Sequence, residues 1–400
     1  MTSQTPSCTS ASHNPPLWGL ALLTFSGTLA MHIFIPALPA VATALHATAS
    51  QMQLTITWYI IGLAVGQLIY GPLSDRFGRR PPLLAGLALY TVASFAALFA
   101  SNAQMLIATR LLAALGGCAG MVLGRVIVRD TTRDTRDTAG RLALMNIMVV
   151  IGPGLAPTVG GLLAAHTGWR SIFAFLTLLG IANICYTWWL LPETRPVLPA
   201  RRRVSPLREY WTLLGSRKYL GFALGGGLAT TSIYAVVAAA PFVLSTQLGR
   251  PTSEVGIYLT LIICAMVIGY LLARVLLRRF TLKAVLLGSN FLSLLSAGAM
   301  LLCCVTGYLN VLTFILPAIV YSIAAGLTSP GAAAQAISVK PRLAGAASGL
   351  YGCGQMVIGA VCTVLAGLGT DHALSAALTL CASGLIGQWM LRGALIHRVG

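Results

Sequence analysis

The chain has 400 residues, of which 57% are apolar and 8% are charged, and its formal net charge is +18. Soluble domains carry about 25% charged residues, and a mean hydropathy of +0.83 over the whole chain excludes one large soluble domain with a single membrane anchor. Nucleic-acid binding is excluded too, because the arginines lie in short clusters between apolar runs and form no single basic face. The composition indicates a protein that crosses a membrane many times.

The first 16 residues are rich in Ser, Thr and Pro and contain no Lys or Arg, so they lack the basic start of a signal peptide. We expect residues 1–16 to be a disordered cytoplasmic leader that precedes the first span. The apolar run that follows, residues 17–42, contains one ionisable side chain, His32. An imidazole in a hydrocarbon environment is either a packing group or a functional one.

A helix needs about 20 apolar residues to cross a bilayer. Polar segments and Gly or Pro breaks divide the chain into twelve predicted spans, so both termini lie on one side. The spans are roughly 17–41, 52–73, 82–101, 104–128, 139–165, 168–191, 218–245, 254–277, 283–304, 309–331, 343–368 and 371–394.

The distribution of Lys and Arg predicts the orientation. If the N-terminus is cytoplasmic, 22 of the 26 basic residues lie in cytoplasmic segments, and only Arg170 and Arg250 lie outside. This bias follows the positive-inside rule, so we expect both termini in the cytoplasm and a multi-pass protein in the cell inner membrane. The basic, Pro-rich segment 192–217 is then a cytoplasmic linker between an N-terminal half, 17–191, and a C-terminal half, 218–400. Two such halves are typical of transporters built from repeats.

The second predicted span ends in "GPLSDRFGRRP", residues 71–81. Asp75 is followed closely by Arg76, Arg79 and Arg80, and a carboxylate at a helix end can pair with arginines or face the N-terminus of a neighbouring helix. An ordinary solvated loop is the alternative, which the regular spacing of these residues makes less attractive.

Arg110 lies within the fourth span and Arg125 at its cytoplasmic edge, and with His32 they are the candidate ionisable residues inside the membrane. No Asp or Glu lies deep in any span. At 1.5 Å per residue, His32 and Arg110 lie about 5 and 9 Å outward of the middles of their spans, at similar depth. We expect Arg110 to stay charged and His32 to be largely neutral, with a role in proton coupling or substrate sensing. Purely structural roles are the alternatives.

The fifth span contains "GPGLAPTVGG", residues 152–161. Proline removes a backbone donor and bends a helix, and clustered glycines let another helix approach closely. We therefore expect a kinked packing helix whose key residues are Gly152, Pro153, Pro157, Gly160 and Gly161.

Several polar or aromatic residues in the spans are candidates to line a substrate cavity, although packing is the alternative for each: Tyr59, Asn146, Tyr234 and Gln355. The nine cysteines are scattered without metal-finger spacing, so we expect packing roles for them and neither a metal nor a cofactor.

These motifs resemble those of the major facilitator superfamily. Residues 71–81 resemble the loop motif between its second and third helices, "RLLAALGG" (110–117) its fourth-helix arginine motif, and 152–161 the fifth-helix motif of its antiporter branch. "GWRSIFAFL" (168–176) and "LPET" (191–194) close the first half as in that branch. Further segments are similar to the Bcr/CflA subgroup of drug:proton antiporters, and they are "PALP" after the first span, residues 53–75, "APFVL" (240–244) and residues 344–355.

The resemblance implies an all-α membrane protein with the major facilitator fold, twelve transmembrane helices in two six-helix halves. It implies that Asp75 and Arg79, with Arg76 and Arg125, belong to a cytoplasmic latch between conformations, and that the fifth helix packs against the eighth. The subgroup's first helix commonly reads like "DMYLPALP" where this chain has "HIFIPALP". His32 therefore stands where its relatives hold an aspartate.

We therefore expect a secondary transporter that exports small amphipathic compounds, drugs of neutral or anionic character, in exchange for protons by alternating access. Its partners would be the substrate, protons and the lipid bilayer, and it would act as a monomer. Proton-coupled uptake or export of an endogenous metabolite by the same fold is the alternative. A membrane enzyme lacks support, because no HExxH, GxSxG or catalytic acid pair is present. The absence of a phosphate-binding glycine loop argues against an ATP-driven pump, and a pure scaffold leaves Arg110 unexplained.

Overall fold

The computed structural model describes residues 16–131, 152, 154–194, 206–340, 343–368 and 371–396. Every regular element within these ranges is helical. Eleven helices or helix pairs in the described part are long and apolar enough to cross a membrane. The predicted span 139–165 lies outside the described residues except for 152 and 154–165, so the count of twelve stays a prediction. Asn146 and Pro153 also lie outside them.

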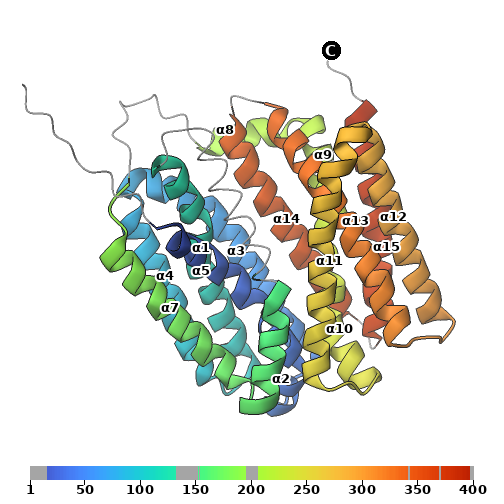
Figure 1. The fold of residues 1–400 in the computed structure, drawn as a ribbon, viewed down its shortest axis with the longest axis horizontal. Coiled ribbons are helices and arrows are strands. Elements are labelled where there is room, and N and C mark those ends of the chain that lie inside the picture. Colours follow the sequence, from blue (N-terminus) through green and yellow to red (C-terminus); the bar gives the residue numbers. More distant parts are fainter. Residues whose placement is uncertain are drawn as a thin grey trace, which may run out of the picture.

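The first group of helices comes from the N-terminal part of the chain. It comprises α1 (Leu17–His32), the short 3₁₀ turn η1 (Ile35–Ala37), α2 (Leu38–Ala44), α3 (Ala49–Phe77), α4 (Arg80–Leu98), α5 (Ala103–Thr131), the helical segment 154–167 and α7 (Arg170–Leu190). Figure 1 shows its labelled helices packed together on one side of the molecule.

The second group follows α8 (Pro206–Leu214), a short helix inside the segment that the sequence predicts to be a linker. It comprises α9 (Arg217–Thr231), α10 (Tyr234–Phe242), the π-helical turn η2 (Val243–Gln247), α11 (Thr252–Arg279), α12 (Leu282–Val305), α13 (Val311–Ser338), α14 (Ala344–Gly367) and α15 (His372–Ile396). These helices lie together on the opposite side of the molecule (Figure 1).

The first span is broken where the sequence predicts one continuous helix. It consists of α1, η1 and α2, with Pro36 and Pro39 near the starts of the two shorter elements. Proline has no N–H and cannot continue the hydrogen bonds of the preceding turn, so α1 stops at His32. The last carbonyls of α1 therefore need donors from elsewhere.

The two groups touch near one end of the molecule, which we call the α2 end because α2 lies there; α8 marks the opposite α8 end (Figure 1). The hydroxyl oxygens of Thr57 on α3 and Thr363 on α14 are 2.6 Å apart. Those of Thr158 in segment 154–167 and Thr260 on α11 are 2.8 Å apart. Gln53 Nε2 donates to the carbonyl of Ala238 at 3.4 Å. Uncharged hydrogen bonds thus close the α2 end.

Candidate functional site

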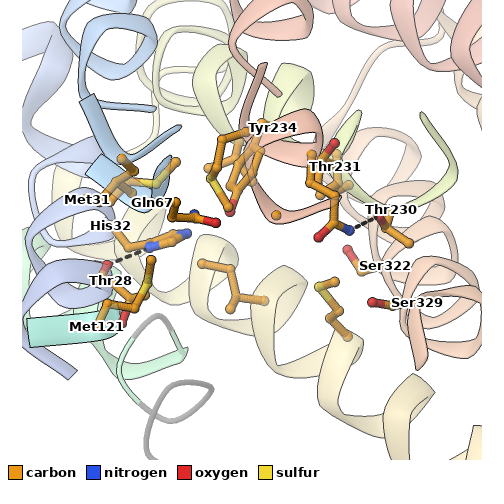
Figure 2. Close-up of a pocket in the computed structure, with 18 of the residues that line it drawn as sticks. Thr28, Met31, His32, Gln67, Met121, Thr230, Thr231, Tyr234, Ser322 and Ser329 are labelled. Carbon is orange, nitrogen blue, oxygen red and sulfur yellow. Dashed lines mark hydrogen bonds between the residues drawn. The ribbon is translucent and has the colours of Figure 1, made fainter. Parts of the chain in front are cut away.

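A cavity of about 350 Å³ lies between the two groups of helices. Its lining residues come from α1, α3 and α5 of the first group and from α9, α10, α11, α13 and α14 of the second. Figure 2 shows labelled polar side chains on both sides of this space, with His32 and Gln67 on one side and Thr230, Ser322 and Ser329 on the other. The lining residues with polar side chains are Thr28, His32, Gln67, Arg125, Thr230, Thr231, Tyr234, Tyr270, Ser322, Ser329 and Gln355.

His32, the last residue of α1, is the imidazole in this lining. Its Nδ1 lies 2.9 Å from the carbonyl oxygen of Thr28, one turn earlier on the same helix. Figure 2 shows the other ring nitrogen, Nε2, turned toward the middle of the cavity. The ring lies beside that of Tyr234 from α10, with centroids 6.2 Å apart. The position singled out by sequence is thus on the cavity wall, facing the second group.

The opposite wall presents hydroxyl and amide groups from the second group. Gln355 Nε2 donates to the hydroxyl of Thr230 at 2.9 Å and to the phenol oxygen of Tyr351 at 3.4 Å. Thr230 itself donates to the carbonyl of Gly226. This wall is neutral and its side chains are held by one another, so it can orient a substrate through fixed polar groups.

Arg110 lies behind α1 and not among the cavity-lining residues. Its Nη1 donates to the carbonyl of Ala30 at 2.7 Å and its Nη2 to that of Met31 at 3.5 Å. The guanidinium also lies against the ring of Tyr59, 4.1 Å from its centroid, and 5.2 Å from that of Phe34. The arginine therefore supplies donors to carbonyls that the end of α1 leaves without helical partners, and cation–π contacts stabilise its charge.

The structure separates several of the residues that the sequence places in one site. Tyr59 is fully buried and donates to the carbonyl of Gly27 at 2.8 Å, so it packs with Arg110 and does not reach the cavity. Tyr234 and Gln355 do line the cavity. Arg125 lines it as well, about one helical turn nearer the α8 end of α5 than the cavity residues Met121 and Val122.

The charged motif at the α8 end forms a network within the first group. Arg79 Nε lies 2.9 Å from Asp130 Oδ2, and both side chains are nearly buried. Arg79 Nη1 also donates to the hydroxyl of Ser74 at 3.0 Å. Arg76 lies against the ring of Phe77. Asp75 occupies the last turns of α3, and its side chain lies outside the described residues. Arg79 is thus paired with the end of α5.

Glu193 is a member of this network that the sequence motif did not single out. Its Oε1 accepts from the backbone N–H of Arg79 at 2.8 Å and its Oε2 from that of Arg80 at 3.1 Å. These donors lie at the start of α4, where a carboxylate is favoured by the helix dipole. Gly78 has φ +92°, and a Cβ there would come 2.6 Å from Glu193 Oε2. The turn needs glycine to let the carboxylate approach.

The glycine- and proline-rich segment packs against α11. A Cβ on Gly161 would lie 2.9 Å from the carbonyl oxygen of Thr252, and Gly256 lies against the backbone of Pro157. Gly160 is in contact with the backbone of Ile33, and Gly152 faces the ring of Phe25 on α1. This segment is therefore in close contact with both the first span and the second group.

Sequence reasoning missed most of the neutral lining. Gln67 could have been found as a polar amide inside an apolar span, but Thr28, Thr231 and Ser322 resemble ordinary small helix residues. In the part of the chain that the structure describes, no group of three His, Cys, Asp or Glu residues could hold a metal ion.

Comparison with known proteins identifies the class. Residues 20–363 match the model of the Major Facilitator Superfamily. Multidrug resistance protein D of Escherichia coli (strain K12) is 33% identical over 383 residues, which cover 94% of this chain and 92% of that protein. A chloramphenicol resistance protein of Pseudomonas aeruginosa is 40% identical over 168 residues, 42% of this chain and 40% of that protein.

Solved structures share the fold at lower identity. A bacterial homologue of the human lysosomal transporter Spinster, in an inward-facing and occupied conformation, superposes with a TM-score of 0.72 at 15% identity, covering 94% of each chain. Fold, cavity and sequence matches agree, and the chain belongs to the Major Facilitator Superfamily. It is a multi-pass membrane transporter and not an enzyme.

Proposed function

We propose that this protein exports small amphipathic compounds of drug-like character, neutral or anionic, in exchange for protons. The observation that carries the proposal is the cavity between the two groups of helices, in which His32 faces a neutral polar wall. Relatives that align over most of the chain are named for multidrug resistance. A cavity lined by both apolar and polar side chains suits amphipathic substrates.

The proposal includes twelve membrane helices in two six-helix halves, with the span around 139–165 as the twelfth, and membership of the Bcr/CflA subgroup. The protein would act as a monomer in the bacterial inner membrane with both termini in the cytoplasm, as its Lys and Arg distribution favours. The α2 end would then face the outside, and the hydroxyl pairs of Thr57–Thr363 and Thr158–Thr260 would keep the outer side closed.

The groups that couple transport to protons would lie in the first group of helices. His32 is placed where a proton entering the cavity meets the substrate, and Arg110 supports the end of the same helix. The Arg79–Asp130 pair, with Asp75, Arg76 and Arg125, would form a latch that changes when the halves rock. Residues 152–161 would seal the first span against α11 during this motion.

Expression in a bacterium that lacks its major drug exporters tests the function. We expect raised resistance and lowered accumulation for some compounds of an antimicrobial panel, and an uncoupler should abolish both effects. Resistance that survives the uncoupler would contradict proton exchange. If no compound is affected, drug export fails, and transport of an endogenous metabolite by the same fold becomes the better account.

A further inference from the structure

The geometry points to Nε2 of His32 as a hydrogen-bond acceptor for the substrate, so that the protein takes uncharged amphiphiles that carry a hydroxyl donor. This inference rests on the proposed function and narrows its substrate class. It also assigns the place where substrate and proton exclude each other.

The first step is the tautomer of His32. A backbone carbonyl can only accept a hydrogen bond, so the 2.9 Å contact with Thr28 requires Nδ1 to carry the hydrogen. A neutral imidazole has one N–H, and Nε2 therefore presents a lone pair. Nε2 makes no hydrogen bond to any residue that the structure describes, and it is turned into the cavity (Figure 2). The ring thus offers the substrate one acceptor and no donor.

The second step is the opposite wall. An amide nitrogen carries two hydrogens, and Gln355 directs its nitrogen at two oxygens, those of Thr230 and Tyr351. Its Oε1 therefore remains as an acceptor. Each wall thus has a hydrogen-bond acceptor, Nε2 of His32 on one and Oε1 of Gln355 on the other. Such a cavity is complementary to a molecule with O–H or N–H donors. A substrate carboxylate has only acceptor oxygens, so it would repel the lone pair of Nε2 and form no hydrogen bond with it.

The third step is the charge around His32. The ionisable groups that face its helix or line the cavity are Arg110 and Arg125 from α5, Tyr59 from α3, Tyr186 from α7, Tyr234 from α10 and Tyr270 from α11. Among the described residues that line the cavity there is no Asp or Glu. Two cations and no carboxylate disfavour a cationic substrate, so the donor that fits Nε2 is an uncharged one.

Protonation changes one atom of this arrangement. A proton that enters the cavity binds the Nε2 lone pair, and no other bond forms or breaks. Nε2 then donates and can no longer accept from the substrate, whose donor loses its partner. One nitrogen therefore cannot hold a substrate donor and a proton together, which is the requirement for their exchange.

Binding of matched phenicols to the purified full-length protein, by calorimetry, tests the inference. Florfenicol is thiamphenicol with its C3 hydroxyl replaced by fluorine, and 1,3-diacetylchloramphenicol is chloramphenicol with both hydroxyls esterified. At pH 8 we expect one of these pairs to show about three- to tenfold weaker binding of the member without the donor, the range for one hydrogen bond. The hydroxyl-bearing member should also bind more weakly as the pH falls from 8, by about twofold or more at pH 4.

Three variants assign these effects to Nε2. In His32→Leu both the difference between paired ligands and the pH effect should disappear. In His32→Gln the side-chain amide can still accept but does not titrate, so the ligand difference should remain and the pH effect should vanish. His372→Gln, which changes an imidazole that lies beside the ring of Phe242 outside the cavity, should retain both effects. If His32→Leu cannot be purified folded, His32→Gln carries the test alone.

The inference is overturned if neither pair shows a difference, if none of the four compounds binds, or if the pH effect persists in His32→Gln. These outcomes are separate from the test of the proposed function. Uncoupler-sensitive efflux with equal affinities within both pairs would leave the export function standing and remove the role of Nε2. Donor-dependent binding without uncoupler-sensitive efflux would support the role of Nε2 and contradict export in exchange for protons.

Discussion

The two groups of helices have unlike interiors. In the first group, His32, Arg79 and Arg110 are buried, and two of them bind carbonyls or a carboxylate of neighbouring helices. The buried polar residues that the structure describes in the second group are all neutral Ser, Thr, Asn or Gln. There, Asn290 Nδ2 donates to Gln388 Oε1 at 2.8 Å, and Ser289 lies 2.7 Å from the Thr328 hydroxyl.

This difference separates two tasks. A proton that binds or leaves changes the local charge, and buried charged groups interact strongly with that change. Hydrogen bonds between neutral hydroxyl groups stay the same across a wide pH range. The first group is therefore the part that can respond to a proton, and the second group provides a wall of fixed shape. Substitutions in either group should therefore have unequal effects on stability and on efflux.

The largest effect should come from the pair at the α8 end. Arg79→Ala removes the 2.9 Å ion pair with the nearly buried carboxylate of Asp130, and breaking a buried ion pair costs about 3–5 kcal/mol. We expect a marked fall in the thermal unfolding temperature of the purified protein and loss of efflux.

The matched control is the exposed pair of Arg250, just before α11, and Glu254 on α11, which lie 3.8 Å apart. Arg250→Ala should cost about 0.5 kcal/mol or less, because a solvated pair contributes little. Equal destabilisation by the two substitutions would remove the contrast between the groups.

Arg110→Leu should have the second largest effect. It deletes two charge-assisted hydrogen bonds to the end of α1 and the contact with Tyr59, with an expected cost of about 2–4 kcal/mol. Arg110→Lys should recover only part of the lost stability, because an ammonium lacks the planar guanidinium whose two nitrogens reach both carbonyls. Unfolding temperatures and efflux rates of both variants measure this, and a Lys variant equal to wild type would contradict the support of α1 by two donors.

Glu193→Gln should have a smaller effect. The amide NH₂ would face one of the two backbone N–H donors at the start of α4, at a cost of about 1–2 kcal/mol. The turn then holds Arg79 less firmly, so we expect slower efflux with little change in substrate affinity. Glu209→Gln, on α8, is the control and should leave efflux unchanged. An altered affinity in Glu193→Gln with a normal rate would argue against a positioning role.

The smallest effect should come from the neutral contact between the groups. Thr57→Val and Thr363→Val each remove one partner of a 2.6 Å hydroxyl pair. A double-mutant cycle should give a coupling of about 1 kcal/mol, near a fivefold change in the population closed at the α2 end. Spin labels attached at positions 43 and 249 of an otherwise cysteine-free variant report that population. The distance between them is measured by electron paramagnetic resonance. Coupling that changes between pH 5 and pH 8 would contradict a proton-independent closure.

Sequence patterns predicted the helical class and most of the spans, because length and hydropathy are local properties that a bilayer imposes on every crossing segment. They did not predict the break of the first span into α1, η1 and α2, although Pro36 and Pro39 mark it. A proline permits either a kink or a helix end, and neighbouring helices decide between them. They also missed α8, whose nine residues lie in a segment too polar and too short to resemble a span.

For the candidate site, sequence alone determined that His32 and Arg110 are ionisable groups at similar depth in apolar spans, because charge and spacing are written in the chain. Only the tertiary structure decided that they face different ways: His32 into the cavity, Arg110 onto the carbonyls behind it. It likewise paired Arg79 with Asp130 and brought Glu193 to the start of α4. The physical reason is that the packing of neighbouring helices decides whether a given face of a helix borders the cavity, the protein core or lipid.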